Sequence, residues 1–297
     1  MDCKVLRGAR AIKSPHFCFV LDRGKVESRY RFIIMKLVGE NLWDLRLARN
    51  ENHFSMNTAL KAAEQCLMAV EDLHRIGFLH RDVKPGNFAV GCPNTNELHT
   101  IFMLDFGLCR KFIGDKPHKD LRLPRAVAPF RGTTRYASLA AHRSAEQSRK
   151  DDIEAWLYMT VEFCTGNLPW RRCRGSDKDG VQRYKEGARK GDGLNEFLKD
   201  CPKKEFTAIL KYLDALQYES IPDYDYIYYC VQHAMNSYKC ESDQPLDWDS
   251  KEKYHGPTKA DRDKRMDSKL DAKLNSNTDG TTKSSSKRSS IISRLFR

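Results

Sequence analysis

Two short stretches of the chain hold side chains that could carry out chemistry together. The stretch GFLHRDVKPGNFAVG contains Asp82, Lys84 and Asn87, and the later stretch MLDFGLCRKF contains Asp105. A carboxylate such as Asp82 can accept the proton of an attacking hydroxyl, and a lysine can neutralise charge that develops on a transferred anion. The oxygens of Asn87 and Asp105 are ligands that suit Mg²⁺. The residue types and their order therefore favour transfer of a phosphoryl group to a hydroxyl.

The spacing of these residues follows a known signature. Residues 80–87 read HRDVKPGN, which matches the pattern H-R-D-L-x-x-x-N with valine in place of leucine, and residues 105–107 read DFG. This pair of motifs, in this order, is the signature of protein kinases. Either triplet alone could be a chance occurrence in a basic protein. Together, with lysine and asparagine at the expected offsets, they argue against chance.

Each residue of the signature then has one expected role. Asp82 orients the substrate hydroxyl and accepts its proton, and Lys84 steadies the γ-phosphate of ATP. Asn87 and Asp105 hold the metal ion through their oxygens. ATP and Mg²⁺ are thus the expected cofactors.

The segments around the motifs predict an α+β fold. Residues 16–38 contain two β-rich runs separated by a polar segment with Gly24, which predicts a hairpin. From Ser55 or Asn57, either of which could cap a helix, apolar residues recur every three or four positions until Gly77. This long helix leads directly into the HRD motif. A short strand is expected in HTIFMLDFG, and further helices in DDIEAWLYMTVEFCTG and EFTAILKYLDALQY.

Composition limits the class of protein. The chain has 297 residues, of which 40% are hydrophobic, as is ordinary for a globular protein. Its ten cysteines form neither a CxxC pair nor a cluster with zinc spacing, which favours reduced thiols. No apolar run is long enough to span a bilayer, and no signal-peptide pattern follows Met1. A cytoplasmic or nuclear location is expected.

The C-terminal segment holds a large share of the positive charge. Residues 251–297 contain 13 Lys or Arg and 6 Asp or Glu, so they carry +7 of the net charge of +12. The run SNTDGTTKSSSKRSS has too few apolar residues to offset the entropy of ordering. The sequence therefore predicts that the folded domain ends near Trp248 and that a basic disordered tail occupies residues 249–297. We expect a solvated arm without a specific nucleic-acid role.

With these motifs in view, the chain resembles the casein kinase 1 superfamily, and most closely its tau-tubulin kinase branch. The similarity runs from about residue 2 to about residue 248, and its other marks are MKLVGENLWDLR, PRAVAPFRGTTRYAS, DDIEAWLYMTVEF and GNLPW. RYASLAAH stands where most kinases have Ala-Pro-Glu, as in this superfamily. The resemblance implies a protein kinase-like fold with a complete, mainly helical C-terminal lobe in residues 39–248. It also implies specificity for Ser and Thr.

The resemblance further implies a site for the adenine ring. Met35 would be the gatekeeper residue, and the backbone from Lys36 to Val38 would form the hinge that binds adenine. Ala89 would lie beneath the ring.

Other residues are implied on the substrate side. Thr133 would brace Asp82 and the catalytic lysine, and Asp152 would tie down the catalytic loop. A phosphate pocket formed by Arg135 and Arg183 would read an acidic or phosphorylated residue upstream of the target Ser or Thr. The expected partners are thus acidic or pre-phosphorylated protein substrates, and the chain itself is expected to be a monomer.

The activation segment can be interpreted without the family. Between Leu108 and Gly132 there is no Ser, Thr or Tyr, so the usual switch by phosphorylation has no acceptor there. An active enzyme would then be constitutively active. The same segment has seven Lys or Arg against two Asp, which favours acidic peptides beside it.

The elements that grip ATP are not found ahead of the hinge. The glycines at 8, 24 and 39 never form GxGxxG. The run RAIK, which ends at Lys13, imitates the motif of the ATP-binding lysine. Only 22 positions separate Lys13 from Met35, however, too few for the helix and two strands that kinases place between them.

A better alignment puts MDCKVL on the helix that in kinases carries a conserved glutamate. Asp2 then takes the place of that glutamate, Leu6 packs toward Phe106, and Lys13 is a surface charge. The expected N-terminal lobe is a truncated remnant in residues 1–38, with one helix and one hairpin.

Three hypotheses remain open from the sequence. The first is an ATP-dependent Ser/Thr protein kinase whose sequence begins at an internal methionine. The alternative is a catalytically impaired pseudokinase or scaffold that binds partners through the groove of its helical lobe and its tail. Intact Asp82, Lys84, Asn87 and Asp105 favour the first, whereas the missing clamp favours the second. In the third, the basic tail binds anionic surfaces and the kinase lobe is a passenger.

Overall fold

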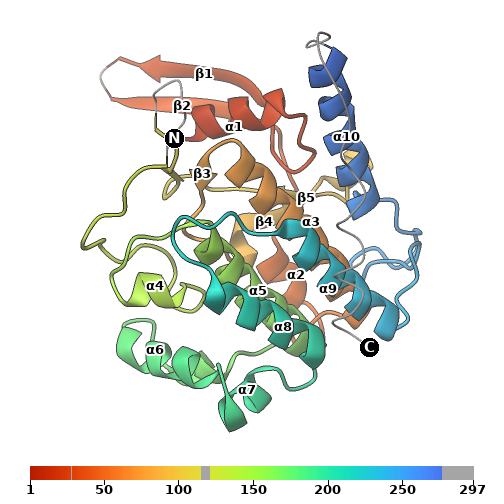
Figure 1. Ribbon diagram of the computed structural model, residues 1–297. Coiled ribbons are helices and arrows are strands. Elements are labelled where there is room, and N and C mark those ends of the chain that lie inside the picture. The colour runs from red at the N-terminus through yellow and green to blue at the C-terminus, as the bar shows by residue number, and fades with distance from the viewer. Residues whose placement is uncertain (28, 115–120, 276–297) are drawn as a thin grey trace.

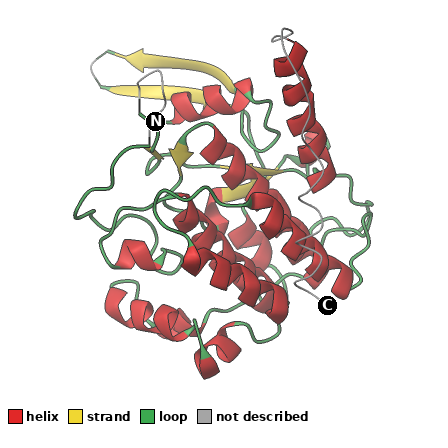
Figure 2. Ribbon diagram, viewed as in Figure 1, coloured by secondary structure: helices red, strands yellow, loops and turns green. Residues whose placement is uncertain are grey.

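The computed structural model describes residues 1–27, 29–114 and 121–275 (Figure 1). Helix α1 (Asp2–Ala11) and the strands β1 (Val20–Val26) and β2 (Tyr30–Met35) lie together at one end of the molecule. The rest is mainly helical and contains only short strands, as Figure 2 shows by colour. The predicted mixture of a few strands with many helices is confirmed.

The predicted hairpin is present, but its turn lies elsewhere. Strands β1 and β2 pair in antiparallel register from Val20 opposite Met35 to Val26 opposite Tyr30. Gly24, which was expected in the polar connection, lies inside β1. A Cβ atom at Gly24 would come within 2.4 Å of the Phe32 ring, so only glycine lets that ring cross the strand. Most side chains of β1 are exposed, so its polar residues are compatible with a strand.

Helix α1 confirms the helix predicted for MDCKVL and extends it to Ala11. Its buried face consists of Val5, Leu6 and Ala9. Lys13 follows in a left-handed turn conformation with a φ of 53° and is exposed, as predicted. This end of the helix therefore carries no buried lysine.

The core of the helical part forms around α3 (Met56–Arg75) and α5 (Arg149–Thr165). Of the two caps that the sequence allowed, Ser55 caps α3, because its side chain accepts a hydrogen bond from the backbone N–H of Thr58. Gly77 follows α3 with a φ of 88°, a conformation that glycine adopts without strain. The two helices are joined where the indole of Trp156 donates to the carbonyl of Ala63 at 2.8 Å.

Short strands position the two signature motifs. Strand β3 (Phe78–Leu79) pairs with β6 (Arg110–Lys111), and β4 (Phe88–Val90) pairs antiparallel with β5 (Ile101–Met103). Because Phe88 lies opposite Met103, the end of the HRDVKPGN loop meets the start of the D-F-G turn. The remaining elements are α2 (Leu42–Leu47), η1 (Pro85–Asn87), η2 (Pro93–Thr95), α4 (Leu139–His142), η3 (Pro169–Arg172), α6 (Lys178–Gly187), α7 (Gly191–Phe197), α8 (Lys203–Ala215) and α9 (Tyr224–Ser237).

The predicted domain boundary near Trp248 is wrong. The chain continues through a further helix, α10 (Lys259–Asn275), which rises beside the body of the molecule in Figure 1. Arg262 on α10 is buried and donates to both carboxylate oxygens of Glu71, and Arg265 bonds Asp72 at 2.6 Å. The prediction failed because it relied on apolar residues, whereas Arg262 and Arg265 attach α10 through charge pairs. Residues 276–297 of the predicted tail lie outside the described residues.

Within the described ranges, no helix has both the length and the apolar character needed to cross a membrane.

Candidate active site

The catalytic loop is held by one buried carboxylate, that of Asp152 on α5. Its Oδ2 accepts hydrogen bonds from the backbone N–H of His80 at 2.7 Å and from Nε2 of His74 at 2.9 Å. Its Oδ1 accepts from the N–H of Arg81 at 2.8 Å. Burial alone would raise the pKa of Asp152, but the His74 hydrogen bond, the two histidine charges and the Arg81 N–H lower it below its ordinary value. These contacts fit the structural role that the resemblance implied.

Asp82 lies at the centre of the site, and three predicted residues surround it. Its Oδ1 accepts from the backbone N–H and the hydroxyl of Thr133, at 2.8 and 2.7 Å. Nζ of Lys84 lies 2.8 Å from its Oδ2 and also donates to the Thr133 hydroxyl at 3.1 Å. The Asn87 amide donates to the Asp82 carbonyl at 2.9 Å. The structure thus brings Asp82, Lys84, Asn87 and Thr133 together in one cluster.

Asp105 lies at the same end of the β4–β5 ribbon as Asn87. The N–H of Leu104, next to Asp105, donates to the Asn87 carbonyl at 2.8 Å. Asp105 is exposed and has a φ of 57°, and its Oδ1 accepts a hydrogen bond from the N–H of Gly107. A non-glycine residue in the left-handed region stores strain of a kind found at functional sites.

Asn87 and Asp105 fit a Mg²⁺ site chemically. The Asn87 amide nitrogen is used by Asp82, which leaves its oxygen without a protein partner among the described residues. The second carboxylate oxygen of Asp105 is similarly without one. Two such oxygens are the kind of ligand set that binds Mg²⁺ together with phosphate and water.

The predicted hinge is joined to the strand that follows the catalytic loop. Ala89 is buried and forms a β-bridge with Asn41, just after the hinge. Val38 has no hydrogen-bond partner for its backbone among the described residues, so its N–H and carbonyl remain available. Met35 is partly exposed, and the Lys36 side chain pairs with Glu97. The assignment of an adenine site to these residues remains a prediction.

The activation segment is tied down by Glu146, which the sequence did not single out. Its buried carboxylate bonds Arg125 through two nitrogens and lies 3.5 Å from Nε of Arg110. Burial alone would raise the pKa of Glu146, but the hydrogen bonds and charges of these arginines lower it. Glu146 therefore supplies a fixed negative charge that holds two arginines of the activation segment.

The two arginines of the predicted phosphate pocket differ in their surroundings. Arg135 donates to the buried carboxylate of Glu162 at 2.8 Å, and its side chain remains 34% exposed. The Tyr136 hydroxyl donates to the other oxygen of Glu162. Arg183 is exposed on α6 and has no ion pair within the described ranges. The pocket assignment remains a prediction, and part of the Arg135 guanidinium is already committed to Glu162.

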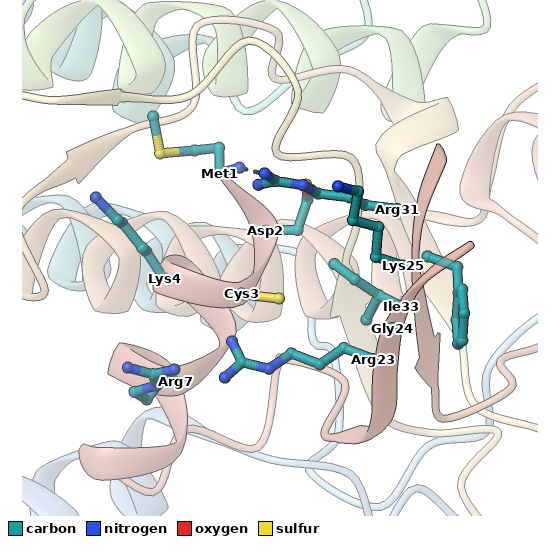
Figure 3. Close-up of a pocket in the computed structure, with 11 residues that line it drawn as sticks. Met1, Asp2, Cys3, Lys4, Arg7, Arg23, Gly24, Lys25, Arg31 and Ile33 are labelled. Carbon is teal, nitrogen blue, oxygen red and sulfur yellow. Dashed lines mark ion pairs between the residues drawn. The ribbon is translucent and has the colours of Figure 1, made fainter. Parts of the chain in front are cut away.

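A groove of ≈ 830 Å³ opens between α1 and the hairpin (Figure 3). Phe32 and Ile33 contribute apolar surface, and Asp2 is the one acidic residue of its lining. Five basic residues line it, and none has an ion-pair partner in the part of the chain that the structure describes. They are Lys4, Arg7, Arg23, Lys25 and Arg31. In Figure 3, Arg23 and Arg31 extend from the hairpin toward α1, whereas Lys4 and Arg7 extend away from the hairpin.

The structure therefore gathers Asp82, Lys84, Asn87 and Thr133 in one cluster, with Asp105 at the same end of the β4–β5 ribbon, as the protein kinase signature predicts. The family model described as "Protein kinase domain" matches residues 10–213, so the chain belongs to the protein kinase family.

Curated relatives agree with this family. A protein of Dictyostelium discoideum named "Probable serine/threonine-protein kinase" is 33% identical over 235 residues, which cover 79% of this chain and 45% of the relative. Serine/threonine-protein kinase spe-6 of Caenorhabditis elegans is 35% identical over 255 residues, or 85% of this chain and 65% of the relative. The chain thus spans between about half and two thirds of the length of these relatives.

Proposed function

We propose that the chain carries the catalytic groups of an ATP-dependent Ser/Thr protein kinase of the casein kinase 1 superfamily. The observation that carries the proposal is the cluster in which Asp82 shares its carboxylate between Thr133 and Lys84. A scaffold has no need of this arrangement. Both curated relatives also carry a Ser/Thr kinase name.

The geometry suggests how the cluster would work. Thr133 occupies Oδ1 of Asp82 with two hydrogen bonds, so Oδ2 is the oxygen that can receive the proton of a substrate hydroxyl. Lys84 lies beside that oxygen and can neutralise charge on the transferred group. Asn87 and Asp105 would hold Mg²⁺, which together with ATP supplies the phosphoryl group and the neutralisation of its charge.

Acidic or pre-phosphorylated proteins are the proposed substrates. Arg135 uses one guanidinium nitrogen on Glu162 and keeps others for an anion. The arginines of the activation segment add positive potential beside the cleft, although Glu146 neutralises part of it.

Phosphate transfer to casein with labelled Mg-ATP tests the proposal. Transfer by this chain is expected to be weak, because no Gly-rich loop covers the phosphates in the described residues. Asp82→Asn should remove whatever transfer is present, whereas Lys211→Met, an exposed change on α8, should leave it unchanged. Transfer that survives Asp82→Asn would contradict the assigned role of this residue.

A second function is favoured by the groove in Figure 3. Five basic side chains, which have no ion-pair partner among the described residues, would attract an acidic segment of another protein. This docking surface differs from the groove of the helical lobe and the tail that the scaffold hypothesis named. A fluorescent poly-glutamate peptide should bind at low salt and lose affinity in the variant Arg23→Glu/Arg31→Glu. Equal binding by both proteins would exclude the groove as the docking surface.

A further inference from the structure

Lys185 is a buried cation that none of the roles above uses. It lies on α6 with no exposed surface, although lysine is rarely buried completely. Its Nζ donates to the backbone carbonyl of Thr134 at 3.0 Å and to that of Ala137 at 2.5 Å. A third contact, at 3.2 Å, joins it to Nε2 of His142. All three partners belong to the segment that follows the activation segment.

The surroundings of Lys185 do not include a direct counter-ion. No carboxylate lies within ion-pair distance of its Nζ in the described ranges, and the rings of Tyr158 and Trp170 lie beside it. Burial lowers the pKa of Lys185 well below its ordinary value. Burial, followed by the charge of Lys185, lowers the pKa of His142 to about 4, so near neutral pH His142 can accept a hydrogen bond. A buried charge without a counter-ion costs stability, and its hydrogen bonds offset only part of that cost.

The two carbonyls that Lys185 holds, those of Thr134 and Ala137, belong to a loop that also carries Thr133 and Arg135. Thr133 precedes them and is bonded to Asp82 through its N–H and hydroxyl. Arg135 lies between them and reaches Glu162. The indole of Trp170 donates to the Arg135 carbonyl at 2.8 Å, so two side chains together hold three carbonyls of this loop.

We propose that Lys185 is a positioning residue that fixes loop 133–137, and through it the placement of the Arg135 guanidinium toward an anionic substrate residue. The part that concerns substrate rests on the proposed function. The part that concerns the loop stands on the hydrogen bonds alone.

Hydrogen exchange in Lys185→Met tests the loop directly. Methionine has nearly the same length and is suited to a buried site, so the variant should fold, although the carbonyls of Thr134 and Ala137 lose their donor. The N–H groups of Tyr136 and Ala137 both bond the Thr133 carbonyl at 2.9 Å and report on the loop. Their exchange should become about tenfold faster. The matched control Lys211→Met should leave it unchanged.

A second arm measures substrate binding. In Lys185→Met, the Kd for a phosphoserine-containing acidic peptide should rise about tenfold, and the Kd for Mg-ATP should stay within about twofold. If the unaltered protein fails to bind the phosphopeptide, the substrate part of the proposed function falls. The hydrogen-exchange measurement at Tyr136 and Ala137 would still test the role of Lys185 in the loop.

Two results would overturn the proposal. One is unchanged exchange at Tyr136 and Ala137 together with a lower melting temperature, which would mark Lys185 as a packing residue. The other is failure of both Lys185→Met and Lys185→Gln to fold. That result would show that Lys185 is needed for folding of the whole domain and not specifically for the placement of the loop. In a folded Lys185→Gln, intermediate exchange rates would support the proposal, because glutamine keeps N–H donors without the charge.

Discussion

Thr133 illustrates how one hydroxyl can organise a catalytic group. It donates to Oδ1 of Asp82 and accepts from Lys84, so it fixes both side chains relative to each other. Thr133→Val keeps the shape and removes the hydroxyl. A hydrogen bond to a charged group contributes about 1.5–3 kcal/mol, so kcat should fall about ten- to a hundredfold.

The matched variant for this prediction is Thr133→Ser, which keeps the hydroxyl. It should retain most of the activity in the same casein assay. Equal losses in Thr133→Val and Thr133→Ser would show that the methyl group, rather than the hydrogen bond, matters.

Asp151 makes the free energy of unfolding depend on pH, and the direction of this dependence can be derived. It is buried at the start of α5, and its Oδ2 accepts from the Ser148 N–H at 2.6 Å. Burial raises the pKa of Asp151 to about 6, with partial opposition from Lys150. Since this exceeds the ordinary value of about 4, the folded state holds the proton more tightly. The free energy of unfolding should therefore fall as the pH rises from about 4 to about 6.

Asp151→Asn removes this titration and can still accept the Ser148 hydrogen bond. Urea unfolding of both proteins between pH 4 and pH 7 should show the variant gaining stability relative to the unaltered protein as pH rises. A difference that is constant across this range would disprove the assigned titration.

Asp82, Lys84 and Asn87 could be predicted because they lie close together along the chain. Asp82, Lys84 and Asn87 fall within six positions of one another, so one loop conformation brings them together. Glu146 and Lys185 could not be found in this way. Their partners lie more than 20 and more than 45 positions away, as for Arg125 and Ala137, and glutamate and lysine are common on any surface. Only the folded chain reveals that they are buried.

At the scale of elements, α10 is attached mainly by ion pairs. Arg262 donates to both oxygens of Glu71 and to Asp225, and it lies 5.0 Å from the Tyr228 ring. Arg262→Met would leave the Glu71 carboxylate buried without its cation. The expected loss in the free energy of unfolding is about 3 kcal/mol, the usual cost of removing one partner of a buried pair.

The control for this prediction lies on the same helix. Lys264 is 80% exposed, so Lys264→Met should change stability by less than about 0.5 kcal/mol. Adding Glu71→Gln to Arg262→Met should recover part of the loss, since the unpaired charge is then gone. A loss below about 1 kcal/mol in Arg262→Met would argue that α10 is only loosely attached.

Elements with local signals were predicted, and elements without them were not. Ser55 and Gly77 mark the two ends of α3 by capping chemistry that needs no tertiary contact. The prediction that Gly24 lies in the turn of the hairpin was wrong. Glycine is common in turns, but here it makes room for the Phe32 ring on the neighbouring strand. Helix α10 carries alternating charges and few apolar residues, a pattern that also describes a solvated arm.

At the scale of the molecule, bound Mg-ATP should contact both the predicted hinge and the proposed Mg²⁺ ligands, Asn87 and Asp105. Mg-ATP at a free concentration a hundred times its Kd should raise the free energy of unfolding by about 2.7 kcal/mol. Thermal unfolding with Mg-ATP, and with ATP plus EDTA, measures this. Asp105→Asn should abolish the difference between the two conditions, because Asp105 is a proposed Mg²⁺ ligand. A magnesium effect that persists in Asp105→Asn would contradict this assignment.

The attachment of α10 also has a consequence for gene defects. Glu71 and Asp72 are made early in translation, but their cations, Arg262 and Arg265, leave the ribosome close to two hundred residues later. A nonsense or frameshift allele that ends between codons 249 and 258 would preserve every proposed catalytic residue, yet it would leave the buried Glu71 carboxylate without its cation and Asp72 with Arg75 alone. Such alleles should reduce the amount of protein through quality-control degradation, and selection would act on them as on losses of the gene.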